Sequence, residues 1–372
     1  MEPLLLPVTG DSLATATVMV LGFMAALFVG SLVLPGIERM GYPLPDGSRK
    51  RYHLTGMTLF FFTHVLAFVA TFVWGVSLTP IVRHFWSLLI VANVVALAIT
   101  LALFFSARRR PDRMAVPHPE GNRLPRTLQD LWFGAELNPT WLGVDLKMYM
   151  YHPSLIGTYL IVLSFAYAQH ERLGELTPQT WCFVGFWFGY LFTHYVKEEF
   201  MLSTWDVISE NFGFMLVWGD LVYVPFLYSL PGWWLVGDTE AWAVWQWAPL
   251  VGFYLLCLWV FREANWQKER YKRDPQVRIW GKPAEALDGR LLVSGWWGLG
   301  RKINYTGEIG VYVAFALTTG LESPYPYLLP LSLTILLLQR AARDDKKCRS
   351  KYGDLWRRYC ERVRFRMLPF VY

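Results

Sequence analysis

The chain has 372 residues, of which 54% are hydrophobic and only 17% are charged, and its formal net charge is +6. This composition, with 19 tryptophans, is far more apolar and aromatic than that of a soluble enzyme of this length. It excludes a water-soluble globular protein and predicts an integral membrane protein.

Three uncharged windows, at residues 12–34, 54–82 and 85–106, reach the length of about 20 residues that a membrane-spanning helix needs. The first window follows an acidic start with no Lys or Arg and no evident cleavage site, so we expect a retained helix and a chain that begins at Met1. The fold class predicted is an all-α, polytopic membrane bundle of nine or ten helices. The further candidate spans are 154–169, 177–195, 211–236, 241–261, 305–321 and 324–339.

A Pro- and Arg-rich linker at 107–126 divides the chain. We expect N-terminal membrane helices at 1–106, a linker and polar loop at 107–153, and a catalytic region with a cofactor pocket at 154–372. Basic clusters favour a cytoplasmic position for the segments that carry them. These clusters lie at 49–51, 108–113, 262–278 and 340–366.

The four cysteines form no CxxC pair, which argues against a disulfide framework or a zinc site, and we expect no metal. No GxGxxG motif follows a strand-like run, which argues against a Rossmann domain. The block at 133–139, with Asp145 and Lys147 after it, is too polar to span a membrane and predicts a structured loop near the surface.

Asp220 lies inside the apolar window 211–236, where a carboxyl group is costly unless it is paired or faces a cavity. It is therefore either a proton donor or a hydrogen-bonding partner of a neighbouring helix. A second series of polar residues precedes Asp220, and this series indicates either a proton relay or an interfacial belt. Its members, spaced by about four residues, are Tyr190, His194, Tyr195, Lys197, Glu198 and Glu199.

Lys268 and Lys272 are spaced i and i+4 at a basic helix end, where they can hold a phosphate or simply fix topology against anionic lipid. Arg301, Asn304 and Glu308 follow at spacings of three, four and seven. If a helix begins there, these three side chains share one face and point at an anionic ligand.

The chain resembles the sterol C14- and C7-reductase family, which includes the sterol-reductase-like domain of the lamin B receptor and, more distantly, sterol C24(28)-reductases and isoprenylcysteine methyltransferases. The resemblance covers residues 128–372 and rests on five ordered motifs. These are Gly134-Ala135-Glu136-Leu137-Asn138-Pro139, the block from Asp206 to Pro225, Ala264-Asn265-Trp266-Gln267-Lys268, residues 292–308, and Cys348 with Lys351-Tyr352-Gly353, Trp356, Tyr359 and Leu368-Pro369.

The resemblance implies a membrane enzyme that reduces a ring double bond of a sterol with NADPH. The cofactor-binding residues that it implies are Lys268 and Lys272 for the phosphates, Trp280 for the nucleotide, Arg301, Asn304 and Tyr305 near the reaction centre, and Arg340, Asp344 and Tyr352. The family often carries Arg at position 272 and His at position 302, but this chain has Lys in both places. The contact with the phosphate is then less bidentate, and the ring contact differs.

An isolated alkene accepts hydride only after protonation, so the site needs a proton donor. The candidates are Tyr190, Asp206, Asp220, Tyr223 and Glu308. The motifs favour reduction at C14, with C7 and C24 reduction, an S-adenosylmethionine-dependent methyltransferase and a non-catalytic sterol-binding protein as alternatives. The chain lacks the nucleic-acid-binding extension of the lamin B receptor, so we expect no nucleic-acid partner. The compartment expected is the endoplasmic reticulum in a eukaryote and the cytoplasmic membrane in a bacterium.

Overall fold

The computed structural model describes residues 5–115, 118 and 123–367. Across these residues the protein is mostly helical, and its short strands form separate two-stranded antiparallel pairs. The expected all-α fold class is confirmed. The chain forms two compact units. Unit 1 comprises Met1–Leu176 and Trp187–Gly237, and unit 2 comprises Thr177–Phe186 and Asp238–Tyr372. The expected division at residues 106 and 153 stays a prediction.

Four helical stretches among the described residues are long and apolar enough to cross a membrane: Gly10–Val33, Phe85–Arg108, Phe214–Gly237 and Val244–Arg273. They coincide with the windows predicted at 12–34, 85–106, 211–236 and 241–261. The total of nine or ten spans remains a prediction.

The window 54–82 was expected to form one span, and its helix is shorter than the window. Helix α2 (Gly56–Phe72) ends after 17 residues, and the short helix α3 (Thr79–Arg83) follows it. Between them Gly75 has a φ of +70°, which an α-helix cannot accommodate. Hydropathy does not reveal the end of this helix, because a glycine is not polar and does not interrupt an apolar window.

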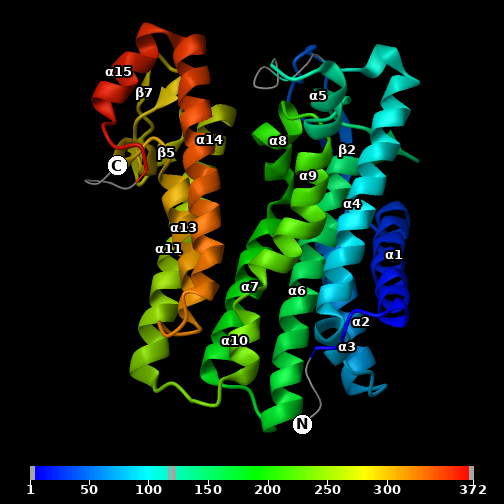
Figure 1. Cartoon of the computed structure of the whole chain (residues 1–372). Helices are drawn as coiled ribbons and strands as arrows, with labels where there is room; N and C mark the ends of the chain where they lie inside the picture. Colours follow the sequence, from blue (N-terminus) through cyan, green and yellow to red (C-terminus); the bar gives the residue numbers. More distant parts are fainter. Residues whose placement is uncertain (1–4, 116–117, 119–122, 368–372) are drawn as a thin grey trace. The chain divides into compact units, whose positions relative to one another are not determined.

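Unit 1 is built around α6, which packs against η4, α10 and α3, while α4 packs against α1 and α9 (Figure 1). Phe85, Phe226 and Trp233 form an aromatic centre, with Phe85 ring centroids 5.2 Å from Phe226 and 5.0 Å from Trp233. Besides α2 and α3, its elements are α1 (Gly10–Val33), β1 (Ile37–Met40), β2 (Arg51–Leu54), α4 (Phe85–Arg108), η1 (Pro111–Arg113), α5 (Arg126–Trp132), β3 (Thr140–Trp141), β4 (Val144–Asp145), α6 (Leu146–Leu173), η3 (Glu198–Ser203), α8 (Trp205–Ile208), α9 (Phe214–Trp218), the π-helix η4 (Gly219–Leu227) and α10 (Gly232–Gly237).

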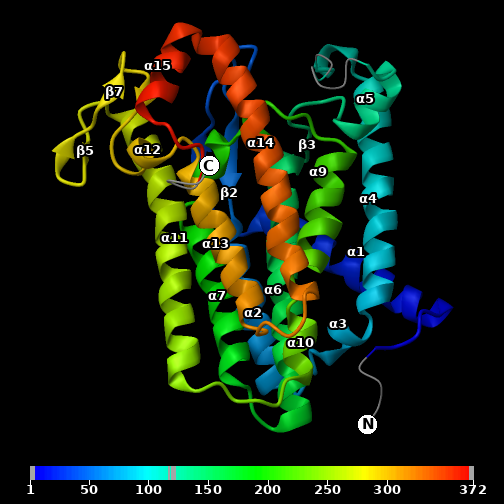
Figure 2. The same cartoon turned by 60° about the vertical axis from the view of Figure 1, so that its left-hand side comes forward.

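Unit 2 is built around α11 and α13, which run side by side, with α14 packed on α13 (Figures 1 and 2). The Tyr254 ring stacks on Phe186 at 4.1 Å, and its hydroxyl donates to the Phe186 carbonyl at 2.5 Å. Helix α7 (Pro178–Val196) begins in this unit and continues into unit 1. The other elements are α11 (Val244–Arg273), β5 (Arg278–Ile279), β6 (Lys282–Pro283), β7 (Ala286–Leu287), β8 (Leu291–Leu292), α12 (Trp296–Leu299), α13 (Ile303–Leu317), η5 (Tyr325–Tyr327), α14 (Leu328–Tyr352) and α15 (Asp354–Arg362).

Candidate functional site

Several candidate cofactor residues of unit 2 lie on α11 and α13, which approach each other closely because of a glycine. A Cβ on Gly307 of α13 would lie 2.6 Å from the Phe261 nitrogen and 2.9 Å from the Cys257 carbonyl oxygen of α11. Small residues at such a contact let two helix backbones meet. As a result the side chains of the two helices reach each other, and Asn304 Nδ2 donates to Asn265 Oδ1 at 3.2 Å.

Lys268 is exposed on α11, and its ammonium lies 4.7 Å from the centre of the Trp297 ring. Trp297 is buried and donates its indole N–H to the Ala264 carbonyl at 2.7 Å, which fastens α12 to α11. Lys272 is one turn further along and also exposed. The i, i+4 pair therefore presents two positive charges on one side of α11.

Arg301 lies before α13 and not on it, so the expectation that it shares a helix face with Asn304 and Glu308 is wrong. The main chain departs from the helix because Arg301 N donates to Phe365 O at 3.0 Å and Lys302 N to Arg366 O at 2.6 Å. Arg301 Nη1 in turn donates to the carbonyls of residues 363 and 364, at 2.6 and 2.9 Å. Asn304 and Glu308 do lie one turn apart on α13.

Lys302 forms an ion pair with Asp344 of α14, a contact that sequence reasoning missed. Lys302 is buried, and burial together with the nearby charge of Lys268 lowers the pKa of its ammonium to about 8. The nearby Asp345 carboxylate opposes that shift in the pKa by favouring the charged form of Lys302. Arg340 also acts on Lys302 electrostatically. The structure thus brings Lys268, Lys302, Arg340 and Asp344 together.

The remaining candidates of unit 2 lie at the ends of elements. Trp280 sits at the tip between β5 and β6 with a φ of +50°, is 53% exposed, and packs edge to face on Trp296 at 5.2 Å. Tyr352 ends α14 and packs against the cluster of Trp356, Tyr359 and Val363. Tyr305 lies in the first turn of α13. The Leu368-Pro369 motif lies outside the described residues.

Three candidate donors of unit 1, Asp206, Asp220 and Tyr223, lie on the π-helix η4 or within electrostatic reach of it. Asp220 is only 9% exposed and lies within electrostatic reach of Asp206 and Lys147. Tyr223 follows on the same element and packs edge to face on Tyr228 at 5.4 Å. A π-helix often marks a functional position, because its widened turn reorients side chains.

Lys147 makes buried contacts that the sequence did not reveal. Its buried ammonium donates to the Asp206 carbonyl at 2.8 Å and to the Glu210 carbonyl at 2.5 Å. The predicted loop at 133–139 supports the same segment, because Asn138 Nδ2 donates to Val207 O at 3.1 Å. This loop and Lys147 together fix the main chain that carries Asp206.

The polar series on α7 does not continue along one helix, since α7 ends at Val196. Glu198 instead lies in η3, where Oε1 is 3.2 Å from His152 Nε2 of α6 and Oε2 accepts the Gly56 N–H at 2.9 Å. The sequence could have indicated this pair, because a histidine and a glutamate in apolar surroundings are usually paired with each other or with another polar group. Tyr190, the first member of the series, is buried beside Trp187.

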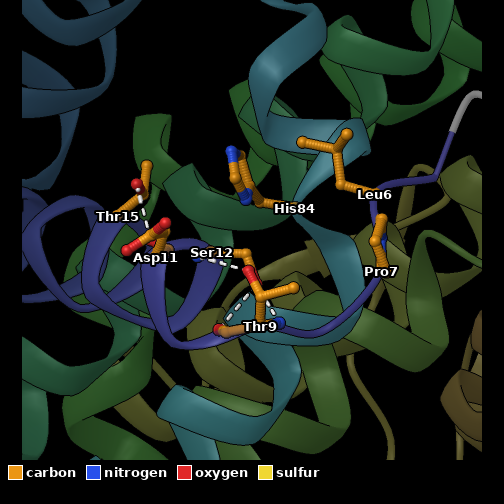
Figure 3. Close-up of a pocket in the computed structure, with 7 residues that line it drawn as sticks. All are labelled: Leu6, Pro7, Thr9, Asp11, Ser12, Thr15 and His84. Atoms are coloured by element: carbon orange, nitrogen blue, oxygen red, sulfur yellow. Dashed lines mark hydrogen bonds between the residues drawn. The ribbon is translucent and has the colours of Figure 1, made fainter.

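A separate hollow of about 230 Å³ opens at the start of α1 (Figure 3). Its hydroxyl groups cap the helix, since Thr9 and Ser12 bond reciprocally and Ser12 Oγ also lies 2.9 Å from Ser87 Oγ. None of the candidate residues lines this hollow. In the part of the chain that the structure describes, no group of three or more metal-ligating side chains comes together.

The chain is similar to known proteins over nearly its whole length. Residues 8–372 match the model of the ergosterol biosynthesis ERG4/ERG24 family, and the chain belongs to this family. It is 36% identical over 363 residues to a Delta(14)-sterol reductase of Arabidopsis thaliana, covering 97% of each chain. It is 36% identical to a Delta(14)-sterol reductase of Methylotuvimicrobium alcaliphilum, over 94% of this chain and 83% of the relative.

A Delta(14)-sterol reductase of Mus musculus is 33% identical, over 95% of this chain and 84% of the relative. These relatives and the apolar helices make the protein an integral membrane protein.

Proposed function

We propose that the protein reduces the C14 double bond of a sterol with NADPH. The observation that carries the proposal is the end-to-end match to relatives named Delta(14)-sterol reductase, which covers 97% of this chain and of the plant relative. The proposal assigns the nucleotide to unit 2 and most of the candidate proton donors to unit 1.

The chemistry of the unit 2 side chains fits a nucleotide with several phosphates. Lys268, Lys272, Lys302 and Arg340 supply cations, which bind phosphate through charge-assisted hydrogen bonds. Two polar atoms, Nε of Arg301 and Oδ1 of Asn304, are buried without a hydrogen-bond partner among the described residues. Buried polar atoms are normally satisfied, so a bound ligand would supply what these two lack.

Within this set we assign the phosphates to Lys268 and Lys272. Trp280, exposed at its hairpin tip, contacts the nucleotide. The other assigned cofactor residues are Arg301, Asn304, Tyr305, Arg340, Asp344 and Tyr352. Asp344 also holds the Lys302 ammonium at the site through their ion pair, before the anionic cofactor binds.

When bound, NADPH supplies the hydride, and the chain's own residues supply the proton. We assign the donor first to Asp220, because it is buried on a π-helix and interacts electrostatically with Asp206 and Lys147. Tyr190, Asp206, Tyr223 and Glu308 are the other candidates. Lys147 would act on the donor indirectly, by fixing the main chain at Asp206.

The test incubates purified protein with NADPH and, separately, with C14-, C7- and C24-unsaturated sterols, and follows the products by gas chromatography and mass spectrometry. We expect reduction of the C14 substrate and a loss of about 100-fold or more in kcat for Asp220→Asn. Asp130→Asn is the control, because Asp130 is also buried but pairs with Arg126 at 2.6 Å outside the proposed site. Retention of activity within threefold in Asp220→Asn refutes that donor.

Lys272→Met tests the cofactor assignment separately. It should raise the KM for NADPH with little change in kcat, because a phosphate contact remote from the reacting atoms contributes uniform binding. If the wild-type protein does not bind NADPH, the reductase proposal fails and an S-adenosylmethionine-dependent methyltransferase or a non-catalytic sterol-binding protein takes its place.

C7 reduction is the second candidate for the bond. One relative, of Acanthamoeba polyphaga mimivirus, is named a probable 7-dehydrocholesterol reductase and is 30% identical over 90% of this chain. The sterol panel separates the C7, C14 and C24 activities directly. The proposed compartment is the endoplasmic reticulum for a eukaryotic host and the cytoplasmic membrane for a bacterial one.

A further inference from the structure

An apolar groove of about 430 Å³ lies in unit 1 between α4, α5 and the start of α9. One wall is Leu97 and Leu101, one turn apart on α4, and the other is Leu128 and Trp132, one turn apart on α5. Phe214 closes it, with its ring 5.6 Å from that of Trp132. Figures 1 and 2 both show α5 beside the end of α4.

Helix α5 turns its polar side inward. Gln129 and Asp130 are buried, with Gln129 Nε2 bonded to Leu124 O at 2.7 Å and Asp130 paired with Arg126 at 2.6 Å. Leu128 and Trp132, by contrast, are 50% and 48% exposed. A surface helix in water would have the reverse arrangement. The exposed apolar side of α5 therefore requires an apolar cover.

Arginines border one end of this groove. Arg108 at the end of α4 donates to the Thr127 hydroxyl of α5 at 3.1 Å, next to the wall residue Leu128. Arg109 and Arg110 follow it and are both exposed. Neither forms an ion pair with a described residue, and Arg110 interacts electrostatically with Glu136 at longer range. Leu101 lies seven residues before Arg108 on the same helix, which is about 10 Å along the axis. The arginines thus follow the apolar wall by about two turns of the same helix, which is the order in which a lipid headgroup follows its acyl chain.

We propose that this groove binds one anionic glycerophospholipid, with an acyl chain between α4 and α5 and the phosphate on the arginines. A row of arginines favours an anionic phosphate over the hydroxyl of a sterol. The groove itself offers no free hydroxyl, because its Thr100 is 3% exposed and donates to Ala96 O at 2.8 Å. The bound lipid anchors α5 and the start of the linker to the membrane surface.

The experiment measures lipid retention by native mass spectrometry and the melting temperature, using the full-length protein delipidated in mild detergent. The probes are dioleoyl phosphatidylglycerol, dioleoyl phosphatidylcholine and cholesterol, each at the same concentration. We expect at least about fivefold more phosphatidylglycerol than phosphatidylcholine to be retained, with a higher melting temperature. Equal retention of phosphatidylcholine, or preferential retention of cholesterol, would overturn the proposal.

Two variants test the two halves of the site. Leu101→Trp fills the groove, and Arg109→Gln with Arg110→Gln removes exposed charges without touching the Arg108–Thr127 contact; each should abolish the preference. The matched controls are Val65→Trp, at a residue 58% exposed on α2, and Arg290→Gln with Arg362→Gln, two exposed arginines of unit 2. Because the arginine variants alter only surface residues, they remain informative if Leu101→Trp does not fold. Loss of retention in the controls as well would show general lipid association and refute a specific site.

Discussion

The contact between Gly134 and Gly213 allows a test of how the loop at 133–139 supports the segment that carries Asp206, a candidate proton donor. Gly134 has a φ of +104°, and a Cβ placed on it would lie 2.6 Å from the Gly213 nitrogen and closer still to the Phe212 carbonyl carbon. Both neighbours are main-chain atoms, so no side-chain rotation relieves the clash. The loop also bonds this segment directly, since Phe212 N donates to Glu136 O at 2.9 Å and Asn211 Nδ2 to Gly134 O at 3.2 Å.

Gly134→Ala should therefore combine two effects. A positive φ at a non-glycine residue costs about 1 kcal/mol, and forcing an extra methyl group into a packed contact costs about 1–3 kcal/mol more. Gly143→Ala is the matched control in the same loop, because Gly143 has a φ of +85° but a Cβ placed on it would meet no atom within 4 Å. The control should show the first effect alone.

The assay is thermal unfolding of both variants in the same detergent. At about 2–4 °C per kcal/mol for a body of this size, the additional cost of about 1–3 kcal/mol should make Gly134→Ala melt about 2–12 °C below Gly143→Ala. It should also lose reductase activity before it unfolds, because the displaced segment carries Asp206. Equal melting temperatures for the two variants would refute the argument from the main-chain contact.

Three further predictions concern other contacts. Desolvation raises the pKa of the half-buried Glu136 carboxyl above its ordinary value of 4.5. Between these two pKa values the native state holds a proton that the unfolded state has released, so stability falls as pH rises. Glu136→Gln should remove this fall, and identical pH profiles of the melting temperature for wild type and variant would contradict the prediction. Lys147→Met removes two buried charge-assisted hydrogen bonds and should lower the free energy of unfolding by about 3 kcal/mol; a change below about 1 kcal/mol in a denaturation curve would count against the role assigned to Lys147. Gly307→Ala should lower the melting temperature by forcing α11 and α13 apart, whereas Gly252→Ala, where nothing lies within 4 Å, should not, and similar values for the two would argue against the close helix contact.

The sequence predicted the membrane class and most helix positions correctly because both depend on local properties. A run of about 20 apolar residues is sufficient to define a span, and the windows at 12–34 and 85–106 became α1 and α4. The basic stretch at 262–273 was likewise predicted as a helix end, and it forms the last turns of α11. Asp220 was recognised because a carboxyl group stands out in an apolar window, and it is buried as expected.

The order of polar residues along the chain did not reveal their partners. Lys302 meets Asp344 across 42 positions, and His152 meets Glu198 across 46. Arg301 has the spacing of a helical face with Asn304, but it is held by the Val363 carbonyl, 62 positions away, which keeps it off α13.

What the sequence by itself determined is therefore the set of helices and the presence of polar groups within apolar surroundings. The tertiary structure decided which of these groups meet, where α2 ends, and that Lys147 holds the main chain at Asp206. The physical reason is that hydrophobic periodicity and helix propensity act over a few neighbouring residues, whereas the pairing of a buried charge depends on whichever distant segment packing brings within about 3 Å of it.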